Sequence, residues 1–204
     1  MKLYGCKGCG STVVEAMLQL AGLEYEYIEA VSWEPFSHHE DLVRLNPLKQ
    51  VPTLVLDDGS VMTESAAIIL WLCERLPQLV PQDAAARAQF YRWMIYVPAN
   101  MYALAPFRDF PAKWIDEEAA QKRFRERTTE RLHELWRQLE TELQPAPYVL
   151  GADMSALDLY LAMVSRWWGG RKWVPENCPR LAAAIALTET HPVIAKVWEN
   201  NFGT

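Results

Sequence analysis

The sequence predicts a small α/β domain followed by an all-helical domain. Two observations carry this prediction: strand-like and helical patterns follow one another in the order β-α-β-α-β-β-α up to residue 77, and only helical spacing follows. A chain of 204 residues that is 50% hydrophobic can bury a sizeable core without disulfides or metals. We therefore expect domains at residues 1–77 and 85–204, joined by a proline-containing linker at 78–84.

The elements of the first domain are placed by apolar spacing and turn residues. Strands are expected at residues 2–5, 24–31, 51–56 and 60–63, and helices at 11–21, 37–45 and 64–76. Gly22 ends the first helix, and Asn46-Pro47 ends the second, which is weak and polar. Asp57-Asp58-Gly59 joins the last two strands as a hairpin.

The second domain shows apolar stripes at helical spacing. One stripe comprises Phe90, Met94, Val97, Met101 and Leu104, and another Leu132, Leu135, Trp136, Leu139 and Leu143. Ser155 and Asp158 have the spacing of a capping box, which predicts a further helix start. Two short helices are expected at 179–187 and 192–198.

Charge and hydropathy exclude several classes of protein. With 26 acidic and 20 basic side chains, a net charge of −6 lacks the footprint of a nucleic-acid binder. No run of about 18 apolar residues predicts a transmembrane span, and the first residues lack the layout of a signal peptide. We expect a cytoplasmic protein, with no membrane partner, whose four cysteines are thiols.

Cys6 and Cys9 lie in the loop between the first strand and the first helix. A helix N-terminus favours ionisation of a thiol, and the thiolate is the reactive form. The Cys-x-x-Cys spacing indicates either a redox pair or half of a zinc site. Zinc requires four ligands, and neither Cys73, Cys178 nor the four histidines form a second matching pair, so we expect no metal. Alternatively, Cys9 only packs against the helix and Cys6 is an incidental loop thiol.

Three segments resemble those of the cytosolic glutathione S-transferases, and the likeness covers nearly the whole chain. Residues 46–54 (NPLKQVPTL) resemble that family's segment before its third strand, and 63–68 (TESAAI) resemble the start of its next helix. Residues 151–158 resemble its capping motif in the second domain. The resemblance implies a thioredoxin-like α/β domain fused to an all-α domain, usually as a homodimer.

The resemblance also implies a glutathione site. Val51 would bind the cysteinyl part of glutathione through its backbone, before a cis bond to Pro52. Gln50 would reach the γ-glutamyl end, Ser65 would bind its carboxylate and Glu64 its ammonium group. The alternative is structural: a fold-defining turn at Pro52 and ordinary helix capping at Glu64 and Ser65.

The catalytic position departs from family members that use a tyrosine at the end of the first strand. Gly5 stands there, and Tyr4 should face the opposite side of the sheet. Counting as in glutaredoxins places Cys9 at the nucleophilic position, whereas an offset of two residues selects Ser11. Cys6 is the third candidate.

These identities predict different chemistry. Ser11 would donate a hydrogen bond to the glutathione sulfur and favour its conjugation to a small hydrophobic electrophile, a detoxification reaction. Cys9 would instead act covalently in a glutathione-dependent disulfide or thiol reductase, where Cys6 could trap it as a disulfide. A third alternative is a non-catalytic binding or regulatory protein. Glutathione transferase is the leading hypothesis.

Four aromatic side chains of the second domain are candidates for the wall of an apolar pocket facing Cys9, although core packing is the simpler role for each. They are Tyr96, Tyr102, Trp167 and Trp168. Asn100 could contact a ligand or cap a kink after Pro98. The glycine-broken segment 166–173 is expected to cover the pocket or pack at a helix end.

The net negative charge of the chain comes from the first domain. Residues 1–77 hold 5 basic and 11 acidic side chains, which accounts for the whole net charge of −6. Long-range attraction therefore cannot draw in an anionic tripeptide. The site must depend on local donors: helix N-termini, the Val51 backbone, and Lys7 or Lys49.

Overall fold

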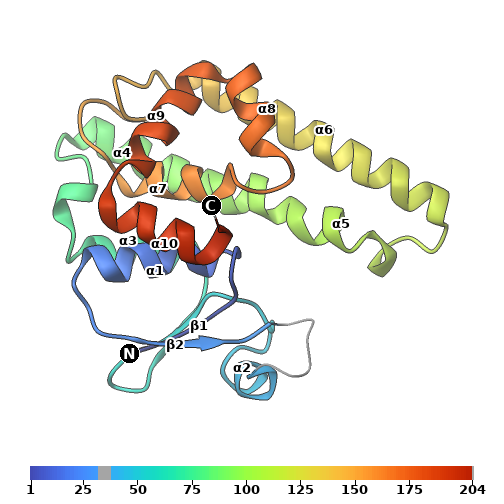
Figure 1. Cartoon of the computed structure of the whole chain (residues 1–204), viewed down its shortest axis with the longest axis horizontal. Coiled ribbons are helices and arrows are strands. Elements are labelled where there is room, and N and C mark those ends of the chain that lie inside the picture. The colour runs from blue at the N-terminus through green and yellow to red at the C-terminus, as the bar shows by residue number, and fades with distance from the viewer. Residues whose placement is uncertain (32–37, 204) are drawn as a thin grey trace. The chain divides into compact units, whose positions relative to one another are not determined.

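The computed structural model describes residues 1–31 and 38–203, which form two compact units. The first comprises residues 1–80 together with 188–203 and contains the sheet, and the second, Pro81–Leu187, is helical (Figure 1). The last helix, α10 (Pro192–Phe202), thus groups with the sheet, although it follows the helical region in the sequence.

The first unit has the predicted β-α-β-α-β-β-α order. Its strands are β1 (Lys2–Gly5), β2 (Glu26–Glu29), β3 (Thr53–Val55) and β4 (Val61–Met62), and its first helices are α1 (Ser11–Leu20), α2 (His39–Leu45) and α3 (Ser65–Cys73). The sheet order is β2-β1-β3-β4, with β1 parallel to β2 and antiparallel to β3. The strand predicted at 24–31 is shorter than expected, and the predicted start of the second helix at Ser37 lies outside the described residues.

Strand register brings three separate loops to one end of the sheet. Tyr4 pairs with Thr53, so the chain leaving β1 lies beside the chain entering β3. Leu54 pairs with Met62, so the chain leaving β4 lies at the same end. The loops after β1, before β3 and after β4 therefore meet there.

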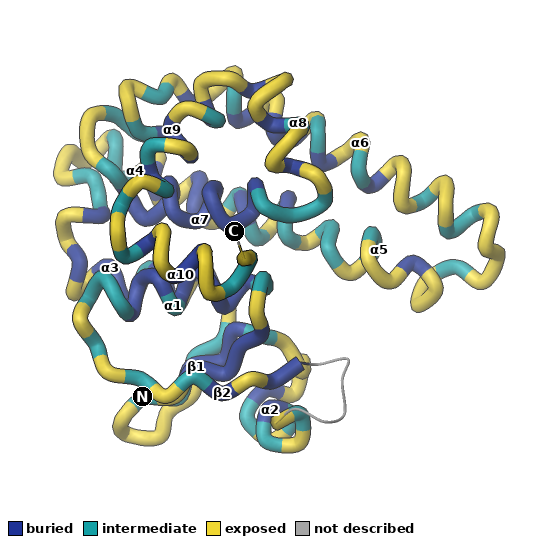
Figure 2. Tube along the Cα trace, viewed as in Figure 1, coloured by how far each residue is buried: buried dark blue, intermediate teal, exposed yellow. Residues whose placement is uncertain are grey.

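Helices cover both faces of the sheet. Helix α1 packs against α3 and α10, and its apolar side chains Val13, Val14, Met17 and Leu18 are buried (Figures 1 and 2). On the other face, Tyr4, Ile28 and Ala30 form a cluster with Leu42 of α2. Successive side chains of a strand point to opposite faces, which explains why Tyr4 packs in this cluster.

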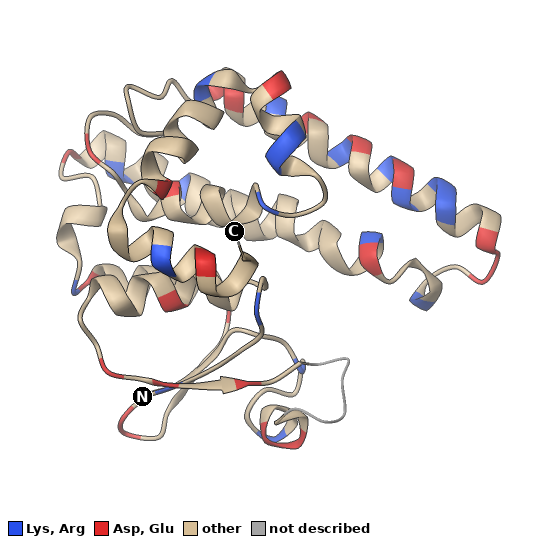
Figure 3. Cartoon of the chain, in the orientation of Figure 1, with Lys and Arg blue, Asp and Glu red and all other residues tan. Residues whose placement is uncertain are grey.

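The second unit is built from helices and short helical turns. They are α4 (Ala84–Tyr96), η2 (Val97–Met101), η3 (Tyr102–Leu104), α5 (Ala105–Asp109), η4 (Pro111–Lys113), α6 (Glu118–Glu142), α7 (Ala156–Val164), α8 (Gly170–Asn177) and most of α9 (Pro179–Glu189), while η1 (Pro77–Leu79) ends the main segment of the first unit. Helix α7 is buried along its whole length, whereas the solvent faces of α6 alternate in charge (Figures 2 and 3). Among the described residues, no helix is both long and apolar enough to cross a membrane.

The start of α7 confirms the predicted capping box. The backbone N–H and hydroxyl of Ser155 both donate to Asp158 Oδ2, at 2.8 and 2.7 Å, and the Val149 N–H donates to Oδ1 at 2.9 Å. Helix α8 was not predicted as a helix. Gly169, with φ of 80°, turns the chain into α8, so the glycines of segment 166–173 start a helix instead of only interrupting one.

Candidate active site

The loop after β1 joins Cys6 and Cys9 in a disulfide. Their Cα atoms are 5.5 Å apart, and the Cys9 N–H donates to the Cys6 carbonyl at 3.2 Å, which closes a tight turn. Cys6 is buried, with 3% of its surface exposed, whereas Cys9 is partly exposed. These two cysteines were expected as thiols. The three-residue spacing within a turn brings them into bonding range instead.

Ser11, the second candidate catalytic residue, lies beneath this loop. Its hydroxyl is fully buried, donates to the Cys6 carbonyl at 3.0 Å and accepts from the Cys6 N–H at 3.1 Å. A Cβ at Gly5 would lie 2.6 Å from Ser11 Cβ and Oγ, so only glycine fits there. The Ser11 side chain therefore fixes the backbone of Cys6.

Two tyrosines flank the end of β1, and neither presents a hydroxyl on the surface of the loop. Tyr4 is buried in the cluster on the other face, as predicted. The Tyr27 hydroxyl is buried close to Gly5, without a hydrogen-bond partner in the described structure. Burial raises the pKa of Tyr27 to about 12, so this phenol stays protonated near neutral pH.

The loop before β3 contains the predicted cis bond between Val51 and Pro52 and is organised by Asn46. Asn46 is buried; its amide donates to the Gln50 carbonyl at 3.0 Å and to Thr53 Oγ1 at 3.2 Å. The Thr53 hydroxyl also donates to the Gln50 carbonyl, at 2.9 Å. The sequence places Asn46 at the end of a helix and at the start of the family-like segment 46–54, without this hydrogen-bonding role. Its position four residues before Gln50 is the sequence signal for this role.

Glu64 and Ser65 occupy the start of α3, at the same end of the sheet. Glu64 is exposed and adopts φ of 63°, a conformation rare for a residue with a side chain. Ser65 is the first residue of α3 and is 93% buried, with 7% of its surface exposed. No side chain caps this helix. Strain of this kind often marks a ligand site.

The C-terminal helix holds the start of α1, a contribution that we did not predict. Asn201 of α10 accepts from the Thr12 hydroxyl at 3.1 Å and donates to Glu15 Oε2 at 2.8 Å. A Cβ at Gly8, which has φ of 72°, would lie 3.6 Å from the Asn201 carbonyl oxygen and from the Phe202 ring. Because nearly 190 residues separate Asn201 from Thr12, no local pattern could reveal this contact.

The other two cysteines lie in closed surroundings. Both Cys73 and Cys178 are buried free thiols. Burial raises the pKa of Cys73 to about 12 and that of Cys178 to about 11. Neither is therefore a thiolate near neutral pH. Among the described residues, no group of three or more His, Cys, Asp or Glu side chains could hold a metal ion.

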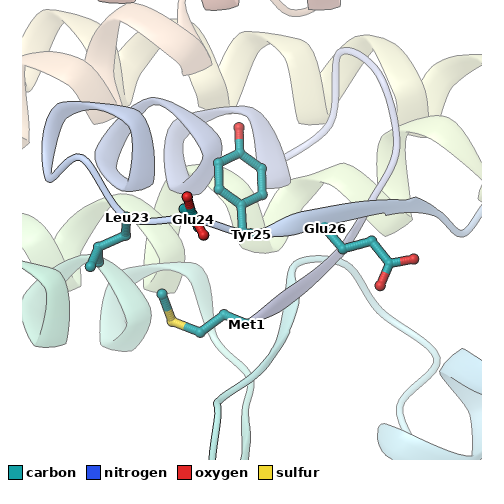
Figure 4. A pocket seen from close by; sticks show the side chains of 5 residues that line it. All are labelled: Met1, Leu23, Glu24, Tyr25 and Glu26. Carbon is teal, nitrogen blue, oxygen red and sulfur yellow. The ribbon is translucent and has the colours of Figure 1, made fainter.

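A shallow hollow lies at the opposite end of the sheet from the three loops. It is lined by Met1, Leu23, Glu24, Tyr25 and Glu26 (Figure 4). Tyr25 points towards α1, where its hydroxyl accepts from Gln19 at 3.0 Å, while Glu26 points away from the sheet (Figure 4). The hollow is open, and Glu26 pairs with Lys2 at 3.3 Å, so the charge of this carboxylate is already partnered.

Within the second unit, three of the four candidate aromatic residues form a group. The Tyr102 and Trp167 rings lie 4.8 Å apart, and the Trp167 and Trp168 rings 5.6 Å apart. Trp168 Nε1 donates to Asp109 at 3.1 Å. Tyr96 instead donates to Gln138 at 2.9 Å. Asn100 lies in the π-helical turn η2 after Pro98 and donates to the Tyr96 carbonyl at 3.2 Å, as expected for a kink cap.

This chain is similar in sequence to several known proteins. Residues 11–75 match the family model of the glutathione S-transferase N-terminal domain. An uncharacterized GST-like protein of Escherichia coli K12, YncG, is 32% identical over 98% of both chains. The chain belongs to the glutathione S-transferase family. Glutathione S-transferase GstA of Escherichia coli O157:H7 is 25% identical over 95% of both chains.

Solved structures show the same fold. A glutathione transferase homologue from Sulfitobacter, determined with bound glutathione, superposes with a TM-score of 0.85 at 24% identity and covers 98% of this chain and 97% of its own. A beta-class glutathione S-transferase of Sphingomonas chungbukensis has a TM-score of 0.81 at 20% identity, with full coverage of both chains. The α/β domain of this family member is therefore thioredoxin-like, and a helical region follows it, as predicted.

Proposed function

We propose that this protein is a glutathione transferase that joins the thiol of glutathione to a small hydrophobic electrophile. The observation that carries the proposal is the strand register, which gathers the Cys6–Cys9 loop, Val51 and the start of α3 at one end of the sheet. These are the three segments that the family resemblance assigns to glutathione.

Glutathione would lie across these loops. The Val51 backbone would pair with its cysteinyl part, as one strand pairs with another. Its γ-glutamyl carboxylate would bind at the start of α3 through Ser65, since a helix N-terminus attracts anions. Glu64 would accept from the γ-glutamyl ammonium group, and the exposed Gln50 side chain would reach the same end. The Asn46 network supports this arrangement because it holds the Gln50 carbonyl, next to Val51.

The start of α1 would stabilise the glutathione thiolate. Its N-cap residue is Gly10, its first turn contains no acidic residue, and no side chain caps it. The thiolate would form by loss of a proton to solvent and attack the electrophile, displacing a leaving group or adding to a double bond. Cys9 and Ser11 are the proposed catalytic residues, with Cys9 acting in the reduced form of the Cys6–Cys9 pair, because only a free thiol can donate a hydrogen bond to the glutathione sulfur. Cys9 is the more accessible, whereas the Ser11 hydroxyl is bonded to the Cys6 backbone.

We propose cytoplasmic detoxification by a homodimer as the setting. Family membership supports the dimer and the electrophile. The acidic composition supports partners other than nucleic acid or membrane.

The experiment combines calorimetric titration of glutathione with conjugation of a chloronitroarene. Cys9→Ser and Ser11→Ala are assayed beside Ser60→Ala, which removes an exposed hydroxyl from the β3–β4 turn. We expect the parent protein and Ser60→Ala to bind glutathione and to conjugate the arene. Cys9→Ser should lose conjugation if Cys9 stabilises the thiolate, whereas loss in Ser11→Ala alone would assign that role to Ser11. Binding without turnover by the parent protein would contradict a transferase and favour a binding or regulatory protein.

A further inference from the structure

We propose that Cys6 and Cys9 form a reversible thiol–disulfide couple that gives this chain a second activity, the reduction of small disulfides by glutathione. The inference rests on the proposed glutathione site for its reductant. It does not require conjugation to an electrophile.

The disulfide lies at the end of the sheet where we place the glutathione site. Cys6 directly follows β1, and the Tyr4–Thr53 pairing places it at the end of the sheet where Pro52 enters β3. Val51, the proposed partner of the cysteinyl part of glutathione, therefore lies at the same end of the sheet as Cys6. A glutathione molecule bound there would bring its sulfur towards the disulfide.

The difference in exposure between the two sulfur-bearing residues sets the direction of attack. Cys6 is 3% exposed and held by Ser11, whereas Cys9 is partly exposed on the turn before α1. An incoming thiolate therefore reaches Cys9 more readily, and the Cys6 thiolate is the leaving group. The uncapped start of α1 favours the thiolate form of Cys9 once the bond is open.

The reaction balances with glutathione as the electron donor. One glutathione thiolate attacks Cys9 Sγ, breaks the Cys6–Cys9 bond and forms a mixed disulfide on Cys9. A second attacks the glutathione sulfur of that mixed disulfide and releases oxidised glutathione and the Cys9 thiolate. The two protons lost by the glutathione thiols are taken up by the products.

The reduced pair then returns to the disulfide by reducing a substrate. The Cys9 thiolate attacks a disulfide R–S–S–R, releases one thiol and forms Cys9–S–S–R. The Cys6 thiolate attacks Cys9 Sγ and releases the second thiol. In sum, two molecules of glutathione and one substrate disulfide give oxidised glutathione and two thiols.

The other two cysteines cannot account for a change in the redox state of the loop. Cys73 and Cys178 are free, buried and distant in sequence from the loop, and neither forms a disulfide. They offer a built-in control, because their thiols should be constant whatever the redox state of the loop.

The test measures loop thiols and disulfide reduction in the full-length chain. Protein equilibrated with or without reduced glutathione is alkylated under denaturing conditions and weighed by mass spectrometry, and turnover of hydroxyethyl disulfide is followed by formation of oxidised glutathione. We expect glutathione to expose two further thiols. Cys9→Ser should fall to the rate of glutathione alone, Cys6→Ser should form a mixed disulfide on Cys9 that only a further glutathione molecule can open, and Cys73→Ala should turn over like the parent.

Two results overturn the inference: a Cys6–Cys9 bond that millimolar glutathione leaves closed, or reduction by Cys9→Ser at the parent's rate. Calorimetry with S-methylglutathione, which has no thiol to open the bond, tests the proposed glutathione site separately. Binding of this analogue, together with a disulfide that reduced glutathione leaves closed, overturns the inference alone. Failure of the analogue to bind, with disulfide turnover retained in the parent and lost in Cys9→Ser, overturns the proposed glutathione site, and the thiol couple then reacts with glutathione directly from solution.

Discussion

Two helices of the helical unit, α4 and α7, begin differently from α1 and α3 of the sheet-containing unit. In the helical unit, α4 is capped by Asp83, which accepts from the backbone N–H groups of Ala85 and Ala86, and α7 by the buried pair Ser155 and Asp158. In the sheet-containing unit, no side chain caps α1 or α3. Since every helix begins with backbone N–H groups that lack partners within the helix, a start without a side-chain cap can serve a ligand.

The comparison explains how an acidic domain can hold an anionic tripeptide. Residues 1–77 carry the whole net charge of −6, so the field of the domain opposes glutathione. The starts of α1 and α3 supply local positive ends near the loops that register gathers. The capped starts of α4 and α7 would stabilise the fold, whereas the open starts of α1 and α3 would bind glutathione.

The largest effect should come from breaking a capped start. Asp158→Ala removes a buried carboxylate that accepts from Val149 and Ser155, and leaves these donors without partners. We expect the free energy of unfolding to fall by about 3 kcal/mol, measured by urea denaturation. Asp83→Ala removes an exposed cap and should cost about 1 kcal/mol. Equal losses in the two variants would contradict the structural role given to the α7 cap.

A second prediction concerns the open start of α3. Ser65→Ala should weaken glutathione binding about tenfold, because a hydrogen bond to a carboxylate contributes roughly 1.5 kcal/mol. The unfolding free energy should change less than in Asp158→Ala. Calorimetric titration checks the affinity, with Ser60→Ala as the matched loss of a hydroxyl from the same unit. Unchanged affinity in Ser65→Ala would separate the start of α3 from the ligand.

A third prediction tests the hold of α10 on the start of α1. Asn201→Ala removes the hydrogen bonds to Thr12 and Glu15, and should lower the unfolding free energy by about 1 kcal/mol and reduce conjugation. Asn200→Ala, at the exposed neighbouring position, is the control and should change neither. If both variants behave alike, the contact does not position the loop.

The smallest effect is a pH dependence in the helical unit. His133 stacks on Trp173 with ring centroids 3.9 Å apart, and burial, together with Arg137 and Arg108, lowers the pKa of His133. The unfolded chain then binds a proton more readily, so stability falls as the pH drops through about 6.5. Urea denaturation at several pH values should show a shallower decline in His133→Phe. An identical decline in both proteins would assign the dependence to other groups.

The order of elements and the apolar stripes could be predicted because turn residues and periodicity are local signals. Helix α8 escaped prediction because Gly169, Gly170 and Pro175 are residues that usually interrupt helices. Its start is set by the left-handed conformation of Gly169, which the sequence permits but does not require.

Motifs in the sequence identify the candidate site residues, but they do not predict the hydrogen bonds and the disulfide that these residues form. The sequence presents Ser11 as a candidate donor to glutathione, whereas the structure ties its hydroxyl to Cys6. Cys6 and Cys9 have the Cys-x-x-Cys spacing of a redox pair, but the disulfide between them depends on the turn that brings their sulfur atoms together. The part played by Asn201 depends on packing between the two ends of the chain.

The most direct test of a glutathione site at the open helix starts is an amide NMR titration of the parent protein with S-methylglutathione. This analogue leaves the Cys6–Cys9 bond closed, so shifts report binding alone. We predict the largest shifts at Val51, at Ser65 and Ala66, and in the loop from Cys9 to Ser11. Shifts confined to the hollow around Met1 and Tyr25, or to the aromatic group of the helical unit, would contradict the account.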